Sequence, residues 1–348
     1  MDTIKPIKIN AKKANHAIST ERLTSAEIGK LWATYMGNSM SKYVLQYFIK
    51  NCDDLDIKKT LVNALNLCED FLRKITEIFE HDHIPVPYGF TEEDVNLGAP
   101  RLFLDEFYLH YLKYSGKAGI SLYAIAIPWM TRLDVREFFT NVIDSTVRLL
   151  NQVNDLLLDK GLLVKVPNIP IQDKVQFVRD QSYLNGWFGD VRPLHSLEIF
   201  HLWDNIDSNA TSKALLMGFS QVVKTDEVRK YLQKGKELTV KHMELCTHRL
   251  HSEDLPSPPL HDNLVTTSTF APFSDKLILF HKIDMFSMRM RSYGNSASVN
   301  GRHDIGILYA KLLADISLYV NEGAKIYIDH GWMELSPQAA DRDDLASK

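Results

Sequence analysis

Four residues in the second half of the chain have side chains of the types that bind divalent metals in proteins. His242, His281 and Asp315 offer two imidazole rings and a carboxylate, and Asp284 adds a second carboxylate one helical turn after His281. Three or four nitrogen and oxygen ligands at one level of a helical bundle could hold iron, zinc or manganese. The sequence therefore permits a site for iron or another divalent metal, which would support oxidase chemistry.

The corresponding residues of the first half favour a structural interpretation. There His110 and Asp144 stand in the same relation as His281 and Asp315. An unpaired polar group in a helical core is costly, so a buried histidine commonly hydrogen-bonds an aspartate. We therefore expect His110 to pair with Asp144 and His281 with Asp315, and metal ligation is the alternative. His110 and Asp144 are the weakest of the candidate metal ligands.

A di-iron site of the carboxylate-bridged kind is not indicated. Such a site takes a Glu-x-x-His motif from each of two helices. The motif in a predicted helix is Glu198-Ile199-Phe200-His201, and its counterpart in the first half is Glu27-Ile28-Gly29-Lys30. Glu198 lies in the first turn of its helix, where capping and the helix dipole account for a carboxylate.

An internal repeat predicts the elements that position these residues. Leu23, Glu27 and Trp32 return 171 residues later as Leu194, Glu198 and Trp203, and the same spacing relates His110 to His281 and Asp144 to Asp315. Near the end of each copy the spacing becomes 170, as for Gly161 and Gly331. We infer an N-terminal extension (1–22), a first domain (23–163), a linker (164–193), a second domain (194–333) and a C-terminal tail (334–348).

Apolar residues recur at helical spacing within each copy. In the first copy we expect helices from a capping box at Thr24 to Glu27, over 53–79, from 102 through His110, and over 134–158. The second copy repeats this pattern over 225–250, 274–291 and 304–328. The long, proline-containing segment 84–100 predicts the crossover of a ferritin-like bundle. The expected fold is all-α, with two tandem ferritin-like four-helix bundles that arise from an internal duplication.

Composition agrees with a folded protein and excludes several classes of partner. The 348 residues are 45% hydrophobic and 24% charged, which is enough for two sizeable cores. A net charge of −4 with scattered Lys and Arg argues against nucleic acid, and no apolar run approaches a membrane-spanning length. The three cysteines are not matched between the copies, and residues 1–17 lack the apolar core of a signal peptide. We therefore expect a cytoplasmic protein.

Each copy opens on a similar motif, Ile28-Gly29-Lys30-Leu31-Trp32 or Ile199-Phe200-His201-Leu202-Trp203, and closes on Asp-x-Gly. With these motifs, the duplicated bundle resembles an uncharacterised family of spore-forming bacilli. Members of that family look like tandem ferritin-like bundles distantly similar to spore coat protein F. The resemblance covers about residues 20–340. It implies a link to the spore, with spore coat proteins as partners, and it implies no particular activity.

Two principal functions follow from these observations. The first is a non-enzymatic structural or interaction protein, with a homo-oligomer or spore coat proteins as its contacts. The second is a ferritin-like metal-binding protein, and a ligand held between helices is a third alternative. The apolar stretch Ile120–Met130 predicts a seam between the bundles, an oligomer contact or a longer helix in its own core. Nine of the 13 histidines lie at or beyond His195, which predicts pH sensitivity in the second copy.

Overall fold

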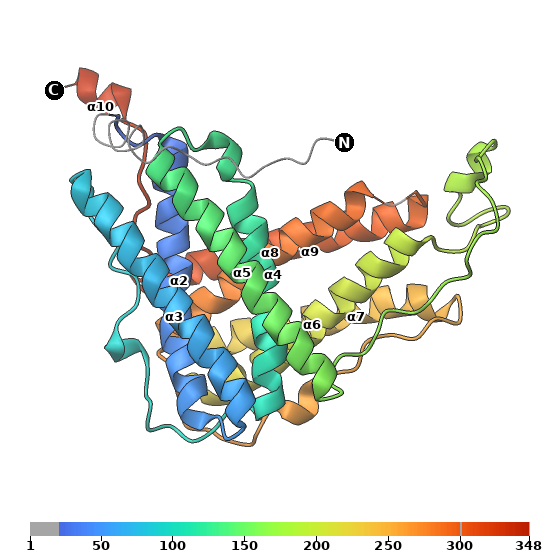
Figure 1. The fold of residues 1–348 in the computed structure, drawn as a ribbon, viewed down its shortest axis with the longest axis horizontal. Helices are drawn as coiled ribbons and strands as arrows, with labels where there is room; N and C mark the ends of the chain where they lie inside the picture. Colours follow the sequence, from blue (N-terminus) through green and yellow to red (C-terminus); the bar gives the residue numbers. More distant parts are fainter. Residues whose placement is uncertain (1–20, 300, 348) are drawn as a thin grey trace, which may run out of the picture.

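The computed structural model describes residues 21–299 and 301–347, and it confirms two tandem four-helix bundles (Figure 1). The first bundle comprises α2 (Ser25–Asn51), α3 (Leu55–His81), α4 (Asp105–Ala124) and α5 (Leu133–Asp159). The second comprises α6 (Ser196–Val222), α7 (Asp226–His251), α8 (Asp275–Ser298) and α9 (His303–Asp329). A short helix, α10 (Arg342–Ala346), follows in the tail. Within the described ranges no helix is both long and apolar enough to cross a membrane.

The helix ends follow from local sequence. Thr24 and Glu27 form the predicted capping box at the start of α2, and His195 with Glu198 forms its counterpart at α6. Gly161 and Gly331 follow α5 and α9 with φ of 67°. A glycine tolerates this left-handed conformation at a helix C-terminus, so both predicted stops are confirmed.

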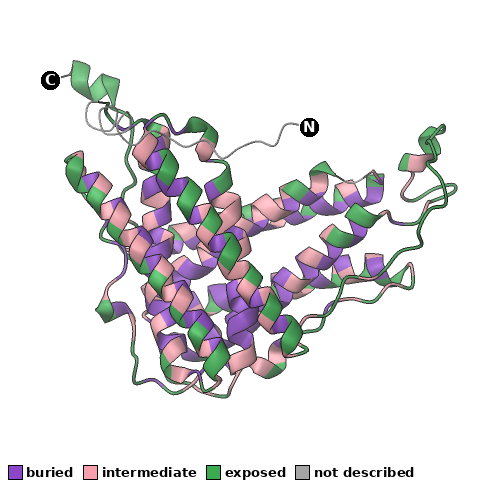
Figure 2. Ribbon diagram, viewed as in Figure 1, coloured by how far each residue is buried: buried purple, intermediate pink, exposed green. Residues whose placement is uncertain are grey.

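The two bundles lie across one another and share a core. In Figure 1 the helices of the first bundle run steeply, while α6 to α9 lie across them. Helix α4 packs against α6, and α2 packs against α8. The largest cluster of buried apolar residues draws on both bundles, and buried positions gather where the bundles meet (Figure 2). The composition is enough for two sizeable cores, and the structure has this shared cluster together with a second, smaller one that belongs to the first bundle alone.

The long connections of the two copies pair with each other. Val95 bridges to Phe273 and Phe103 bridges to Val265, both antiparallel. The flanking hydrogen bonds repeat in the same way: Asn96 N donates to Pro272 O at 2.8 Å, and Thr266 N donates to Leu102 O at 3.0 Å. In each pair of contacts, adding 170 to the first-copy residue of one contact and subtracting 170 from its second-copy residue gives the other contact. The two halves are therefore related by a pseudo-two-fold axis through this crossing.

The change in spacing occurs within these connections, earlier than the sequence suggested. His83 and Asp254, 171 residues apart, share a φ of 56°, whereas α4 and α8 begin at Asp105 and Asp275, 170 residues apart. The predicted equivalence of His110 with His281, and of Asp144 with Asp315, is therefore wrong by one residue. One residue turns a helical position by about 100°, which places it on a different face.

Two apolar stretches behave differently. In Ile120–Met130, the side chains of Tyr123, Ala126 and Met130 are buried in the smaller core cluster of the first bundle, while Ile125 and Trp129 are exposed. Residues 164–191 of the linker, here called the arm, form an excursion beside the second bundle in Figure 1, and around Tyr183 and Gly186 the arm lies against the start of α9. The arm exposes many large apolar side chains, among them Ile171, Phe177 and Phe188.

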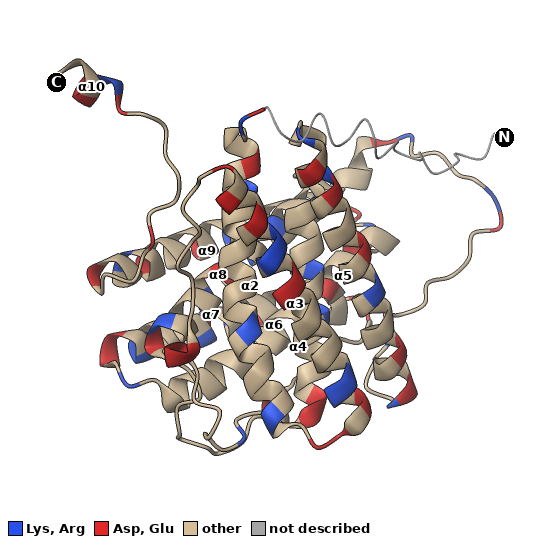
Figure 3. Ribbon diagram, turned by 60° about the vertical axis from the view of Figure 1, so that its left-hand side comes forward, with Lys and Arg blue, Asp and Glu red and all other residues tan. Residues whose placement is uncertain are grey.

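Figure 3 shows acidic and basic positions interspersed along the helices of the molecule in that view.

Candidate functional site

Two of the predicted metal ligands do meet, at the edge of the second bundle. His242 on α7 is fully buried, with Nδ1 3.2 Å from the hydroxyl of Tyr293 and Nε2 3.3 Å from Oδ2 of Asp315. Burial lowers the pKa of His242 to about 4, although the hydrogen bond to Asp315 opposes this. Asp315 also accepts a hydrogen bond from Lys241 at 2.9 Å. The pair is a neutral imidazole held between a phenol and a carboxylate.

His281 lies elsewhere, so the predicted convergence of His242, His281 and Asp315 is wrong. The Nε2 atom of His281 lies 3.0 Å from the hydroxyl of Tyr111, a residue of the other bundle. Tyr111 occupies the position of His281 in the first copy, 170 residues earlier, so this contact lies at the pseudo-two-fold axis. Across residues 21–299 and 301–347, no group of three or more His, Cys, Asp and Glu side chains is placed to hold a metal ion.

His110 and Asp144 do not pair either. Asp144 is exposed on α5 and forms an ion pair with Arg148 of the same helix. The ring of His110 stacks on that of His261 with centroids 3.9 Å apart. At the pseudo-symmetric place, Phe90 packs on Phe280 at 5.1 Å. The one-residue shift in the repeat explains why the predicted partner faces solvent.

Two residues nominated from sequence do share one site. His281 and Asp284 both line a cavity of about 260 Å³ between α2, α4 and α8, here called the main cavity. Arg291 lines it as well, and its apolar wall includes Met40, Tyr123 and Met285. His281 is fully buried, and its Nδ1 atom has no hydrogen-bond partner among the described residues. The main cavity thus has the usual character of a ligand site, an apolar hollow with a few convergent polar groups.

Burial sets the protonation of this site. It lowers the pKa of His281 far below its ordinary range, and the charge of Lys282 adds to the effect. The ring is therefore neutral at pH 7, with one nitrogen that donates and one that accepts. Burial also raises the pKa of Asp284 to about 6, against the influence of Arg291. A carboxyl group close to its titration point thus stands beside a neutral imidazole.

Small residues open the main cavity. Ala33, Gly37 and Ser41 follow one face of α2 at four-residue spacing, and all three line the hollow. A Cβ atom added at Gly37 would meet nothing within 4 Å. The spacing of these small residues on one helix face is the sequence pattern that could have indicated the cavity.

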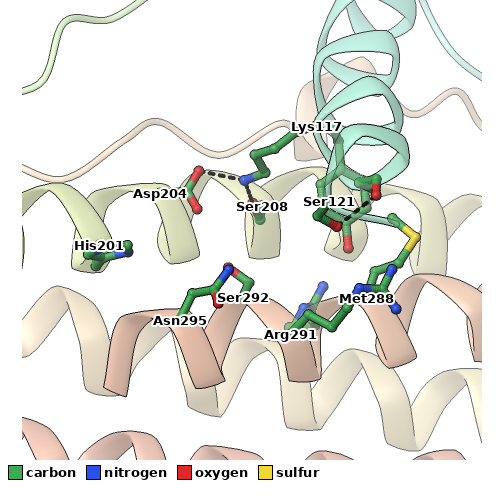
Figure 4. A pocket seen from close by; sticks show the side chains of 12 residues that line it. Lys117, Ser121, His201, Asp204, Ser208, Met288, Arg291, Ser292 and Asn295 are labelled. Carbon is green, nitrogen blue, oxygen red and sulfur yellow. Dashed lines mark hydrogen bonds and ion pairs between the residues drawn. The ribbon is translucent and has the colours of Figure 1, made fainter. Parts of the chain in front are cut away.

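A smaller cavity, of about 120 Å³, is the pseudo-symmetric counterpart between α4, α6 and α8 (Figure 4). Asp204 and Ser208 take the places that Ala33 and Gly37 have in the main cavity. Lys117 reaches them from α4 and donates to the Asp204 carboxylate and to Ser208 Oγ, the latter at 2.7 Å. Arg289 and Arg291 also line this hollow, and Arg291, Met288 and Ala118 belong to both cavities. The two cavities therefore share a wall.

Buried carboxylates at the helix starts have a structural role. Glu198 accepts backbone N–H bonds from His195, Gly301 and Arg302 at 3.0, 2.9 and 3.1 Å, and Arg192 donates to both of its oxygens. Burial opposes ionisation of Glu198, but these hydrogen bonds outweigh it and lower its pKa to about 2. The predicted capping role is confirmed, and Glu198 in addition ties the start of α6 to the start of α9.

The first copy has the same carboxylate clamp, together with an arginine that local sequence patterns do not reveal. Glu27 accepts backbone N–H bonds from Thr131 and Arg132 at 2.9 and 2.8 Å. The side chain of Arg132 forms ion pairs with Asp82 and Asp134, both at 2.6 Å. The local sequence around Asp82 gives no sign of this ion pair. The return of Arg132 as Arg302, at the 170 spacing, is the signal that could have identified it.

Comparison with known proteins places the chain in a family. No curated protein matches it. The crystal structure of a putative spore coat protein from Bacillus halodurans is similar at 14% sequence identity and a TM-score of 0.40, over 43% of this chain and 98% of that one. The family described as protein of unknown function (DUF3231) matches twice, at residues 12–175 and 182–345, one match for each copy of the repeat. The chain belongs to this DUF3231 family.

Proposed function

We propose that the protein is a non-enzymatic binding protein that holds a small organic ligand in the main cavity. One observation carries the proposal: His281 is fully buried, yet its Nδ1 atom meets no partner among the described residues in the wall of a 260 Å³ hollow. A buried polar atom without a hydrogen bond costs about 1–3 kcal/mol. A polar group of a ligand that reaches this atom from the hollow would satisfy it.

The protonation of the His281–Tyr111 pair supports binding by that pair rather than proton transfer, while Asp284 is the group of the site that titrates near pH 6. Burial lowers the pKa of His281 and raises that of Tyr111 far above its ordinary value. A general acid or base works best with a pKa near the operating pH. Neither member of this hydrogen-bonded pair meets that condition, so the pair is suited to orient a ligand.

The side chains that line the main cavity indicate the chemical character of the part of the ligand that would lie there. Aromatic and thioether side chains line the main cavity, including Tyr111, Tyr123, Met285 and Met288. Methionine adapts to ligands of different shape, and sulfur makes favourable contacts with aromatic rings. An engineered apolar cavity of about 150 Å³ holds benzene, so a hollow of this size accommodates one aromatic ring.

Filling the main cavity tests the proposal. Benzamide and benzoate serve as matched probes, and binding is measured by titration calorimetry and by the shift of the thermal midpoint. We expect at least one probe to bind the wild type and to lose its effect in Gly37→Leu, whose side chain fills the hollow. Gly29→Leu is the control, because Gly29 is an exposed position of the same helix with open space around it. Equal binding to Gly37→Leu and the wild type would refute the proposal, as would no binding of either probe.

We further propose that the protein acts at the spore, alongside coat proteins. The resemblance to a family of spore-forming bacilli supports this location. Fractionation of mature spores from a spore-forming host tests it, because a coat-associated protein appears in the coat extract. Recovery of the protein only from vegetative cells would contradict the location and leave the binding function in place.

A further inference from the structure

We propose that the smaller cavity is an oxyanion site, which receives the carboxylate or phosphate group of the ligand. The inference rests on the proposed function for the body of the ligand, which lies in the adjoining main cavity; Ala118, Met288 and Arg291 line both hollows. The charge of the residues around the smaller cavity carries the argument. Lys117, Arg289 and Arg291 supply three cations, whereas Asp204 is the one carboxylate among the lining residues and is already paired with Lys117.

Arg289 is the central observation. Its side chain is buried, with a residue exposure of 2%, and its Nη1 atom donates a hydrogen bond to Thr239 Oγ1 at 3.3 Å. The guanidinium also lies 4.7 Å from the ring of Phe286, while Nε and Nη2 have no partner in the part of the chain that the structure describes. Arginine stays protonated in proteins, and a buried charge without an opposite charge is strongly unfavourable. Among the described residues, Arg289 is thus a buried cation that lacks an anion.

Arg291 adds a second incomplete guanidinium. Its Nε atom is buried with no partner in residues 21–299 and 301–347, and its side chain belongs to the wall between the two cavities. Arginine presents its N–H groups in a planar fork that matches the two oxygens of a carboxylate or phosphate. Ser292 and Asn295 line the same hollow and provide neutral hydrogen-bonding groups.

The repeat provides an internal comparison. At the 170 spacing of these helices, Arg289 corresponds to Gly119 and Arg291 corresponds to Ser121. The first copy folds into the same four helices without either cation. The same helix arrangement therefore forms in the first copy without these two cations, which supports a role in binding for the pair.

Calorimetry at low ionic strength with three probes tests the assignment. Benzoate and benzamide share a shape and differ in charge, and inorganic phosphate lacks the organic body. We expect benzoate to bind the wild type about 10-fold or more tightly than benzamide, the usual effect of one charge-assisted hydrogen bond. Arg289→Met should abolish that preference, and Arg291→Gln should weaken it. Arg148→Gln is the control, because Arg148 is exposed on α5.

The outcomes separate the two proposals. Equal affinity for benzoate and benzamide overturns the oxyanion site and leaves the proposed function standing. Phosphate binding that is lost in Arg289→Met, without binding of either organic probe, supports the oxyanion site and overturns the organic ligand. An equal loss in Arg148→Gln overturns the site, because it shows a general charge effect. Thermal melts confirm that Arg289→Met is folded; if it is not, Arg291→Gln decides.

Discussion

Replacement of Glu198 by glutamine should remove a large part of the stability of the second bundle. The hydrogen bonds around this carboxylate lower its pKa from 4.5 to about 2. A difference of that size corresponds to about 3 kcal/mol of folding free energy. Its side chain is fully buried, so solvent screens these contacts little. We therefore expect Glu198→Gln to lower the free energy of unfolding at pH 7 by about 2–4 kcal/mol.

The dependence on pH identifies the cause. A carboxyl group with a lowered pKa in the folded state stabilises the protein above its ordinary pKa of 4.5, and this contribution is lost as the pH falls toward 2. The difference between wild type and Glu198→Gln should shrink by about 1.4 kcal/mol per pH unit below 4.5. Urea unfolding at pH 7, 4.5 and 3.5 measures it. Glu227→Gln is the control, because Glu227 is exposed and its ion pair with His330 lies at the surface. A difference below about 1 kcal/mol at pH 7, or one that does not change with pH, would refute the reasoning.

Three further predictions follow from the buried histidines, the metal hypothesis and the arm. Burial lowers the pKa of His110 to about 3 and that of His242 to about 4, so both groups favour folding above pH 6.5 and oppose it as the pH falls. Each should cost about 1.4 kcal/mol per pH unit below 6.5, and a thermal midpoint equal at pH 5.5 and pH 8 would contradict this. If His242 and Asp315 hold a metal, the wild type should contain stoichiometric metal after incubation with ferrous iron, and the variant His242→Phe should not. Phenylalanine is chosen because the first copy has Phe71 at the corresponding position. Elemental analysis that finds no metal in either protein rejects the site. The exposed apolar arm predicts self-association, which light scattering should show for the wild type and not for the triple replacement of Ile171, Phe177 and Phe188 by serine; a strictly monomeric wild type rules it out.

The sequence predicted the fold well because helices leave local signals. Periodic apolar residues, the capping box at Thr24 and the glycines at 161 and 331 located the helices to within a few residues in most cases. The end of α8 was less well predicted, since it extends to Ser298 rather than to about 291. Its last turns carry Ser, Asn and Gly, whose weak helix propensity is overcome by packing against α9.

The candidate site could be predicted only in part. His281 and Asp284 line one cavity, as residues one turn apart on a single helix can, and their role as ligands stays a prediction. Their partners come from the other bundle, and a sequence carries no local signal for how two bundles cross. A single omitted residue in the connection also rotated the predicted faces of two helices. For that reason the repeat pairs Asp144 with a buried histidine, whereas Asp144 is exposed on α5.

The paired connections of the two copies have an evolutionary consequence. Contacts that exchange under a two-fold operation are those of a symmetric dimer, in which each subunit lends the same surface to the other. The chain is in effect such a dimer within one polypeptide, which fits an internal duplication. A single polypeptide frees each half to change alone, because a substitution no longer appears twice. One half can thus carry Lys282 and Arg289 in its interior where the other has Leu112 and Gly119, a difference that two identical subunits could not have.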